Sequence, residues 1–126
     1  MSDRQRIFIE RMKIRPDDRV LEVGCGHGIA ASLICERLVQ GRYTAIDRSQ
    51  KMIDAAKRRN AQFVAGGKAE FLRGDVQTIE LGDRLFDKIF AQRVRLFHDE
   101  PERARALVKR WLAPRGKVFV EYDEPE

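Results

Sequence analysis

Apolar residues recur along the chain in two alternating patterns, short runs typical of buried strands and longer stretches with helical spacing. The short runs predict five strands, at residues 19–23, 43–46, 69–72, 87–91 and 117–122. Apolar positions three or four residues apart predict helices over residues 6–13, 29–40, 49–64 and 99–112. Strands separated by helices imply parallel pairing, with helices on both faces of one sheet, and so the α/β class.

Residues with special backbone preferences mark the predicted boundaries. Ser49 and Asp99 are favoured N-cap residues, and Gly41 is expected to end the preceding helix. Residues 114–116 read Pro-Arg-Gly and predict a turn into the fifth strand. Residues 77–85 are weakly patterned, so we expect a loop with one turn of helix there.

The first predicted strand, residues 20–23, leads directly into glycines at alternate positions, Gly24, Gly26 and Gly28. A glycine loop between a strand and a helix is where an α/β protein brings its backbone close to a nucleotide-like ligand. The dinucleotide fingerprint needs glycine at position 29, where this chain has Ile29. The spacing therefore disfavours a dinucleotide, and a purely structural turn is the alternative.

The other predicted strands also end in groups that can bind a ligand. Asp47 follows the second strand, Asp75 the third and Gln92 the fourth. Ligands of parallel sheets bind beyond the carboxyl ends of the strands, so these side chains are expected at one site. A short carboxylate such as Asp47 suits two ribose hydroxyls, although it could also serve only to start the next helix.

Composition indicates one globular domain covering residues 1–126, with 43% hydrophobic residues. No apolar run approaches the roughly 20 residues of a membrane helix, and charges interrupt the N-terminal segment, so we expect a cytoplasmic protein without membrane partners. Cys25 and Cys35 have no metal-like spacing, and no metal site is expected.

The net charge of +5 is uneven, because residues 1–60 hold 13 Lys and Arg against 8 Asp and Glu. A basic face can attract nucleic acid, but no aromatic residues interleave with these charges as a single-strand platform would require. The run at residues 57–59 is typical of a solvated helix face. A small-molecule substrate is favoured over nucleic acid.

The segment Glu22-x-Gly24-x-Gly26-x-Gly28 resembles the first motif of the class I S-adenosylmethionine-dependent methyltransferases. Segments 44–52, 74–76, 86–92 and 112–118 resemble the motifs that follow it, so the resemblance extends over residues 19–122. It implies a three-layer Rossmann-like sheet of about five mainly parallel strands. It also implies methyl transfer from S-adenosyl-L-methionine, with S-adenosyl-L-homocysteine as product.

The resemblance carries over to individual residues of the cofactor site. It implies that Asp47 binds the ribose, that Arg48 and Met52 flank the adenine, and that Asp75 accepts a hydrogen bond from the adenine amino group. The full set of expected cofactor-binding residues is Glu22, Gly24, Cys25, Gly26, Gly28, Asp47, Arg48, Met52, Asp75, Val76 and Gln92.

The methyl group of this cofactor is already activated, so alignment and exclusion of water are the protein's main tasks. A general base is needed only if the acceptor must lose a proton. His98 follows the fourth strand and is the candidate base, but the sequence is equally consistent with a surface histidine that has no catalytic role. No catalytic residue is assigned.

The chain departs from the family pattern at its end, because the family sheet has seven strands and only five are predicted here. Two expectations follow: a homodimer that covers the edge of the fifth strand, or a non-catalytic or minimal cofactor-binding module that acts with a partner. A nicotinamide-dependent oxidoreductase and an aminopropyl transferase are the further alternatives.

Overall fold

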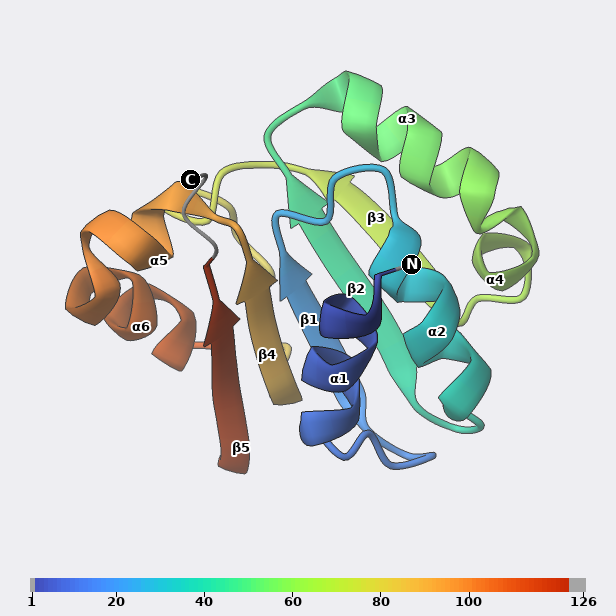
Figure 1. Cartoon of the computed structure of the whole chain (residues 1–126), viewed down its shortest axis with the longest axis horizontal. Coiled ribbons are helices and arrows are strands. Elements are labelled where there is room, and N and C mark those ends of the chain that lie inside the picture. Colours follow the sequence, from blue (N-terminus) through green and yellow to red (C-terminus); the bar gives the residue numbers. More distant parts are fainter. Residues whose placement is uncertain (1, 123–126) are drawn as a thin grey trace.

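A computed structural model describes residues 2–122, and its centre is one sheet of five parallel strands. The strands are β1 (Arg19–Val23), β2 (Arg42–Asp47), β3 (Ala69–Arg73), β4 (Phe86–Gln92) and β5 (Leu112–Glu121). Their order across the sheet is β3-β2-β1-β4-β5, so the order reverses between β1 and β4. All five arrowheads point to the same end of the molecule in Figure 1. The predicted α/β class and parallel pairing are confirmed.

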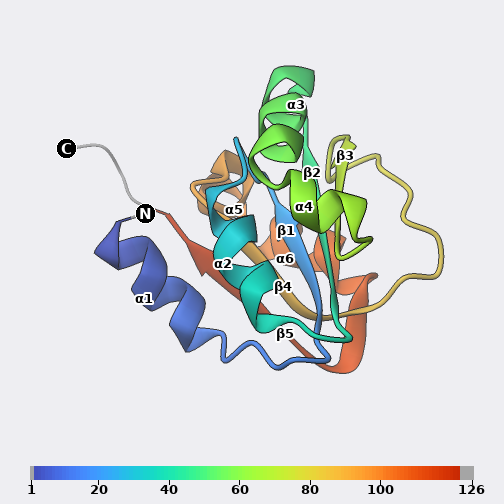
Figure 2. The same ribbon diagram turned by 90° about the vertical axis from the view of Figure 1, so that its right-hand side faces the viewer.

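Six helices cover the two faces of this sheet (Figure 2). One face carries α1 (Asp3–Arg11), α2 (Ile29–Arg37), α3 (Gln50–Arg59) and the short α4 (Ala61–Ala65), and the other carries α5 (Arg95–Asp99) and α6 (Pro101–Lys109). Successive strand residues point to opposite faces, so Val20 joins the core under α2 and Leu21 joins the core under α6. Because both faces are covered, β1 is buried along nearly its whole length.

The helix predicted from Ser49 to residue 64 is broken at Asn60 into α3 and the short α4 (Ala61–Ala65). The Asn60 side chain is fully buried and donates hydrogen bonds to the carbonyls of Gly28 (3.0 Å) and Ala56 (2.9 Å). Its carbonyl oxygen accepts a hydrogen bond from the Ser32 hydroxyl at 2.6 Å. Asn60 leaves the helical conformation and ties α2 to α3.

The segment after β4 differs from the sequence prediction in two ways. A helix that was not expected, α5, occupies residues 95–99, so Asp99 lies within it and is not the N-cap of the next helix. Asp99 instead forms an ion pair with Arg95 at 3.4 Å. The helix α6 begins at Pro101, a residue suited to a first helical turn, and ends before the predicted boundary at residue 112.

The strand β5 begins at Leu112, five residues before the predicted start. Phe86 pairs with Leu112 and Lys88 with Lys117, so the extra residues 113–116 form a bulge and not the expected turn. Gly116 is required within this bulge, because a Cβ there would come within 2.8 Å of the Phe86 carbonyl. Proline is tolerated because β5 is an edge strand.

Two smaller differences concern helix ends. The helix α1 begins at Asp3, before the predicted residue 6, because the Ser2 hydroxyl accepts a hydrogen bond from the Gln5 N–H at 3.2 Å. The helix α2 ends at Arg37, before Gly41, since Leu38 is extended. Within residues 2–122, no helix has the length and apolar character needed to cross a membrane.

Candidate functional site

The loop after β1 adopts the backbone conformation that its glycines predict. Gly24, Gly26 and Gly28 all have positive φ angles, of 77°, 55° and 84°. A Cβ on Gly24 would lie 2.5 Å from Cγ2 of Val94. A Cβ on Gly26 would meet nothing within 4 Å, so that backbone is open to a ligand. The loop is therefore a tight turn with one exposed face.

Gly28 has a different role from the first two glycines. A Cβ there would lie 2.7 Å from Nδ2 of Asn60 and 2.9 Å from Cβ of Ala56. The residue lets α2 approach α3 closely and lines neither of the two cavities described below. Helix packing therefore explains why residue 28, which the sequence predicts to bind the cofactor, is a glycine.

Asp47 joins the end of β2 to the glycine loop. Its Oδ2 accepts a hydrogen bond from the Gly26 N–H and its Oδ1 accepts one from the Ser49 N–H, both at 2.9 Å. A carboxylate has about four acceptor positions, so two remain for other donors. Asp47 both fixes the loop and presents acceptors beside it.

Two adjoining cavities lie at the carboxyl end of the sheet, beside the point where the strand order reverses. The α1 cavity, of about 430 Å³, extends from the glycine loop to the first turn of α1 and includes Glu22 and Cys25. The β3 cavity, of about 460 Å³, extends toward the end of β3 and includes Asp47 and Asp75. Four residues line both cavities: Gly24, Gly26, Gln92 and Arg93. The loop therefore lies at the middle of one elongated site.

Glu22 is the buried acid of the α1 cavity. Its side chain accepts a hydrogen bond from the Tyr43 hydroxyl at 2.5 Å. Burial raises the pKa of Glu22 to about 8, against the lowering effect of this hydrogen bond, and the nearby Asp47 charge raises it further. Burial also raises the pKa of Tyr43 well above its usual value, so the phenol stays a donor. The carboxyl group can thus exchange a proton near neutral pH.

Cys25 lines the α1 cavity together with Glu22. Its Sγ donates to the Gly26 carbonyl at 3.4 Å, and its side chain is buried. Burial raises the pKa of this thiol above its usual range, and the charges of Glu22 and Asp47 act in the same direction. Cys25 therefore contributes a small neutral side chain to the α1 cavity.

Residues 74–76 follow β3 and line the β3 cavity. Asp75 Oδ1 accepts a hydrogen bond from the Gln77 N–H at 2.8 Å, and Oδ2 lies 3.9 Å from Arg48 Nε. The Val76 carbonyl accepts a hydrogen bond from Arg110 at 2.6 Å, which anchors the loop to α6. Arg48 also lines this cavity. The carboxylate of Asp75, which can accept a hydrogen bond from a ligand, is thus held beside the apolar side chain of Val76.

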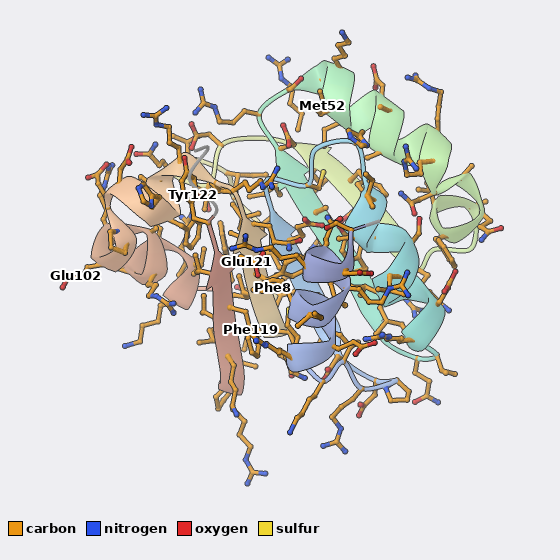
Figure 3. All side chains as sticks on the ribbon, in the orientation of Figure 1. Phe8, Met52, Glu102, Phe119, Glu121 and Tyr122 are labelled. Atoms are coloured by element: carbon orange, nitrogen blue, oxygen red, sulfur yellow. The ribbon has the colours of Figure 1, made fainter. Side chains whose placement is uncertain are left out.

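Met52 and His98 are placed differently from the rest of the predicted site. Met52 lies near the start of α3 (Figure 3) and lines neither cavity. The His98 ring stacks on Tyr122, with centroids 4.1 Å apart, and also lines neither cavity. Nine of the eleven predicted cofactor-binding residues line the two cavities, and Gly28 and Met52 do not. The nine are Glu22, Gly24, Cys25, Gly26, Asp47, Arg48, Asp75, Val76 and Gln92.

Gln92 carries an acceptor with no donor. Its Oε1 is buried and has no hydrogen-bond partner among residues 2–122. A buried acceptor left unpaired costs about 1–3 kcal/mol. Because Gln92 lines both cavities, this oxygen is available to a donor on a bound ligand.

Several residues of the α1 cavity were not anticipated. Arg93 has a left-handed backbone, with φ of 58°, and its N–H donates to the Glu121 carbonyl at 2.8 Å. The Glu121 carboxylate pairs with Arg4 at 3.3 Å, which joins the first turn of α1 to the end of β5 (Figure 3). These contacts depend on tertiary packing, so the sequence gives no direct indication of them. The only local indication is that Arg93 directly follows the predicted site residue Gln92.

Comparison with known proteins gives the family. The pattern of the methyltransferase domain family matches residues 20–116. Phosphoethanolamine N-methyltransferase 1 of Arabidopsis thaliana is 33% identical over 114 residues, which are 90% of this chain and 22% of that enzyme. The chain spans less than two thirds of the length of the first curated relatives that it matches, with shares of 32%, 65% and 22%.

Solved structures share the fold. A SAM-dependent methyltransferase from Thiobacillus denitrificans in complex with S-adenosyl-L-homocysteine matches with a TM-score of 0.80 and 21% identity, over 95% of this chain and 48% of that one. The 4+2 cyclase SpnF matches with a TM-score of 0.78 and 27% identity, over 92% of this chain and 42% of that one. With the family pattern covering most of its length, this chain belongs to the family of methyltransferase domains.

Proposed function

We propose that the chain, as one domain of residues 1–126, binds S-adenosyl-L-methionine across the two cavities and transfers its methyl group to a small molecule. The observation that carries the proposal is the pair of adjoining cavities that meet at Gly24, Gly26, Gln92 and Arg93. The adenosine part fits the β3 cavity and the amino-acid part fits the α1 cavity.

The residues of the β3 cavity match the donors of an adenosine. Asp47 has two free acceptor positions for ribose hydroxyls, and its bonds to Gly26 and Ser49 hold it in place. Asp75 offers Oδ2 to an amino group, and Val76 gives an apolar surface for a base. Arg48 also lines the base end, whereas Met52 lies outside it.

The residues of the α1 cavity suit the charged end of the ligand. Glu22 and the unpaired Oε1 of Gln92 are acceptors for an ammonium group. A cation beside Glu22 would favour its carboxylate, so binding is expected to release a proton near neutral pH. Gly24, Gly26 and Gly28 complete the turn, with Cys25 packed beneath it.

When bound, S-adenosylmethionine supplies a methyl carbon on a sulfonium that a nucleophile can attack, and the C–S electron pair returns to sulfur. The chain's residues hold the donor at the junction of the cavities, and α1 with Arg93 borders the space for the acceptor. Their contribution is alignment and exclusion of water. His98 lines neither cavity, so it is not assigned as a base.

A small-molecule acceptor is supported by the phosphoethanolamine methyltransferase relative and by the limited size of the α1 cavity. The second candidate is a cofactor-binding module that does not transfer a methyl group by itself. It is favoured by the 4+2 cyclase, whose name describes a different reaction on the same fold. Formation of S-adenosylhomocysteine from S-adenosylmethionine with a panel of small amines and acids separates the two candidates.

Calorimetry tests the cofactor directly. We expect S-adenosylmethionine and S-adenosylhomocysteine to bind at micromolar Kd and NAD not to bind. Asp47→Ala should weaken binding about tenfold or more, since charge-assisted hydrogen bonds each contribute about 1.5–3 kcal/mol. Asp54→Ala removes an exposed acid of α3 and serves as the matched control. Binding of NAD alone, or unchanged affinity in Asp47→Ala, would contradict the assignment.

Two further proposals concern the setting of the chain. A cytoplasmic location is supported by the two free, buried cysteines, Cys25 and Cys35. A homodimer through β5 is supported by the outer edge of that strand, which no other described strand covers. Cell fractionation tests the first, and sedimentation showing a monomer at high concentration would contradict the second.

A further inference from the structure

A cavity of about 530 Å³ lies at the opposite end of the sheet from the cofactor site, beside the first residues of β4 and the bulge of β5. It is bordered by the end of α1, the α1–β1 connection and the edge strand, which meet at the lower end of Figure 1. We call this cavity the basic hollow. Its basic lining residues are Arg11, Lys13, Arg15, Lys88, Arg115 and Lys117.

Two of the three acidic residues that line the basic hollow form ion pairs within the protein. Asp18 pairs with Lys88 at 2.5 Å, and both side chains are largely buried. Asp87 pairs with Arg19 at 3.0 Å. Only Asp17 remains to balance the other cations, because Lys88 is already neutralised.

The other five cations of the hollow are exposed and have no partner within the part of the chain that the structure describes. None of their side chains forms a hydrogen bond or ion pair with another of residues 2–122; they are Arg11, Lys13, Arg15, Arg115 and Lys117. Five unpaired charges of one sign around one hollow repel one another. An anion bound in the hollow would relieve that repulsion.

Protection of the sheet edge accounts for only part of this arrangement. Lysine and arginine on an edge strand discourage pairing with another sheet, which explains Arg115 and Lys117. It does not explain the cations on the α1–β1 segment, which lies beside the strand. Lys13 is there in a left-handed conformation, with φ of 51°, and its carbonyl accepts a hydrogen bond from Lys88 at 3.3 Å. The buried pair in the floor of the hollow thus fixes a strained cationic residue at its rim.

The chemistry of the lining selects the kind of anion. The only aromatic residue of the hollow is Phe119, which is partly buried against the core that contains Phe8 (Figure 3). No exposed ring is available to stack on an unpaired base, so the hollow offers charge without a stacking platform. Flexible cations on two separate segments suit successive phosphates of a backbone.

We propose that the basic hollow binds the phosphodiester backbone of double-stranded nucleic acid, at a surface separate from the cofactor cavities. The contact is expected to be independent of base sequence, because exposed Arg and Lys side chains can pair with the phosphates of any sequence. The methyl donor and the duplex then occupy opposite ends of the same sheet. The inference does not depend on the identity of the methyl acceptor.

Fluorescence anisotropy with a labelled 20-base-pair DNA duplex of mixed sequence tests the proposal. With five phosphate contacts, affinity should fall about 500-fold when salt rises from about 50 to 200 mM, because the log–log slope is about −0.9 per contact. The triple variant Lys13→Gln, Arg15→Gln, Lys117→Gln should bind at least about tenfold more weakly at low salt. Its fall over the same salt range should shrink to about 12-fold.

The matched control removes the same charge from α3, with Lys51→Gln, Lys57→Gln and Arg58→Gln. It should leave duplex affinity within about twofold if the basic hollow is the site. Equal losses in both triple variants would overturn the proposal in favour of a general charge effect, and so would absence of duplex binding by the unaltered chain. Tight binding of ATP that the hollow variant abolishes, without duplex binding, would also overturn it.

A second readout separates this inference from the proposed function. The affinity of the hollow variant for S-adenosylhomocysteine should equal that of the unaltered chain, which also shows that the variant is folded. If S-adenosylhomocysteine fails to bind any of the proteins while the duplex binds as described, the proposed function fails and the basic hollow stands.

Discussion

At the scale of single residues, Glu22 is an ionisable carboxyl group that is only 3% exposed. Its pKa of about 8 in the folded chain lies above the ordinary value of 4.5, so the folded state holds the proton more tightly. The free energy of unfolding should therefore fall as the pH rises from about 4.5 to 8, by up to about 4 kcal/mol. The stability supplied by this proton is fully present only below that window.

Glu22→Gln should remove most of this pH dependence. Glutamine keeps an acceptor for the Tyr43 hydroxyl and cannot ionise, so the variant should be more stable than the unaltered chain at pH 8. Urea unfolding at several pH values between 5 and 8 measures the effect. A stability curve with the same slope in both proteins would show that Glu22 does not titrate as described.

Gly28 and Gly67 illustrate two different reasons why a position requires glycine, namely a left-handed backbone and a lack of space for a Cβ. Both have positive φ, but only Gly28 has neighbours where a Cβ would lie. Gly67→Ala should cost about 1–2 kcal/mol for the left-handed conformation alone. Gly28→Ala should cost about 1–3 kcal/mol more, because the methyl group meets Asn60 and Ala56. Chemical denaturation of both variants makes the comparison, and equal losses would argue against close packing of α2 on α3.

At the scale of elements, the junction of α3 and α4 depends on Asn60. Asn60→Ala leaves the buried carbonyl of Gly28 and the hydroxyl of Ser32 without their partner. We expect a loss of about 2–4 kcal/mol in unfolding free energy. Gln50→Ala on the exposed start of α3 should change stability by less than about 0.5 kcal/mol. Thermal and urea unfolding measure both, and a small effect of Asn60→Ala would contradict its role as a tie between helices.

The elements that the sequence predicted well are those with local signals. The strand at residues 19–23 is apolar, short and followed by glycines, and β1 has those bounds. Asn60 breaks a helix through contacts with residues 28 and 32, which no local pattern contains. The bulge of β5 depends likewise on the close approach of Gly116 to Phe86. The local sequence pattern therefore could not predict where that strand begins.

The same division holds within the site. Asp47 and Asp75 were predicted because parallel strands bring their carboxyl ends to one edge. Glu121 and Arg4 could not be predicted, because their ion pair joins segments more than a hundred residues apart. Gly28 was predicted through its motif, but packing against Asn60 explains its identity.

At the scale of the whole molecule, the sheet separates two chemically different ends. The carboxyl end carries the buried Glu22, the half-buried Asp47 and Asp75, and an unpaired acceptor around the glycine loop, and the amino end carries exposed cations that have no partner among residues 2–122. Parallel strands produce this separation, because every strand starts at one end and finishes at the other. A small-molecule donor and a polyanion can therefore bind without competing.

The most direct test of the central claim is a crystal structure of the chain with S-adenosylhomocysteine. We predict one molecule spanning both cavities, with its ribose hydroxyls on Asp47 and its adenine beside Asp75 and Val76. Its amino group should lie within hydrogen-bond distance of Glu22 or Gln92. A ligand bound elsewhere, or an intact site that stays empty at saturating concentration, would contradict the assignment of these cavities to the cofactor.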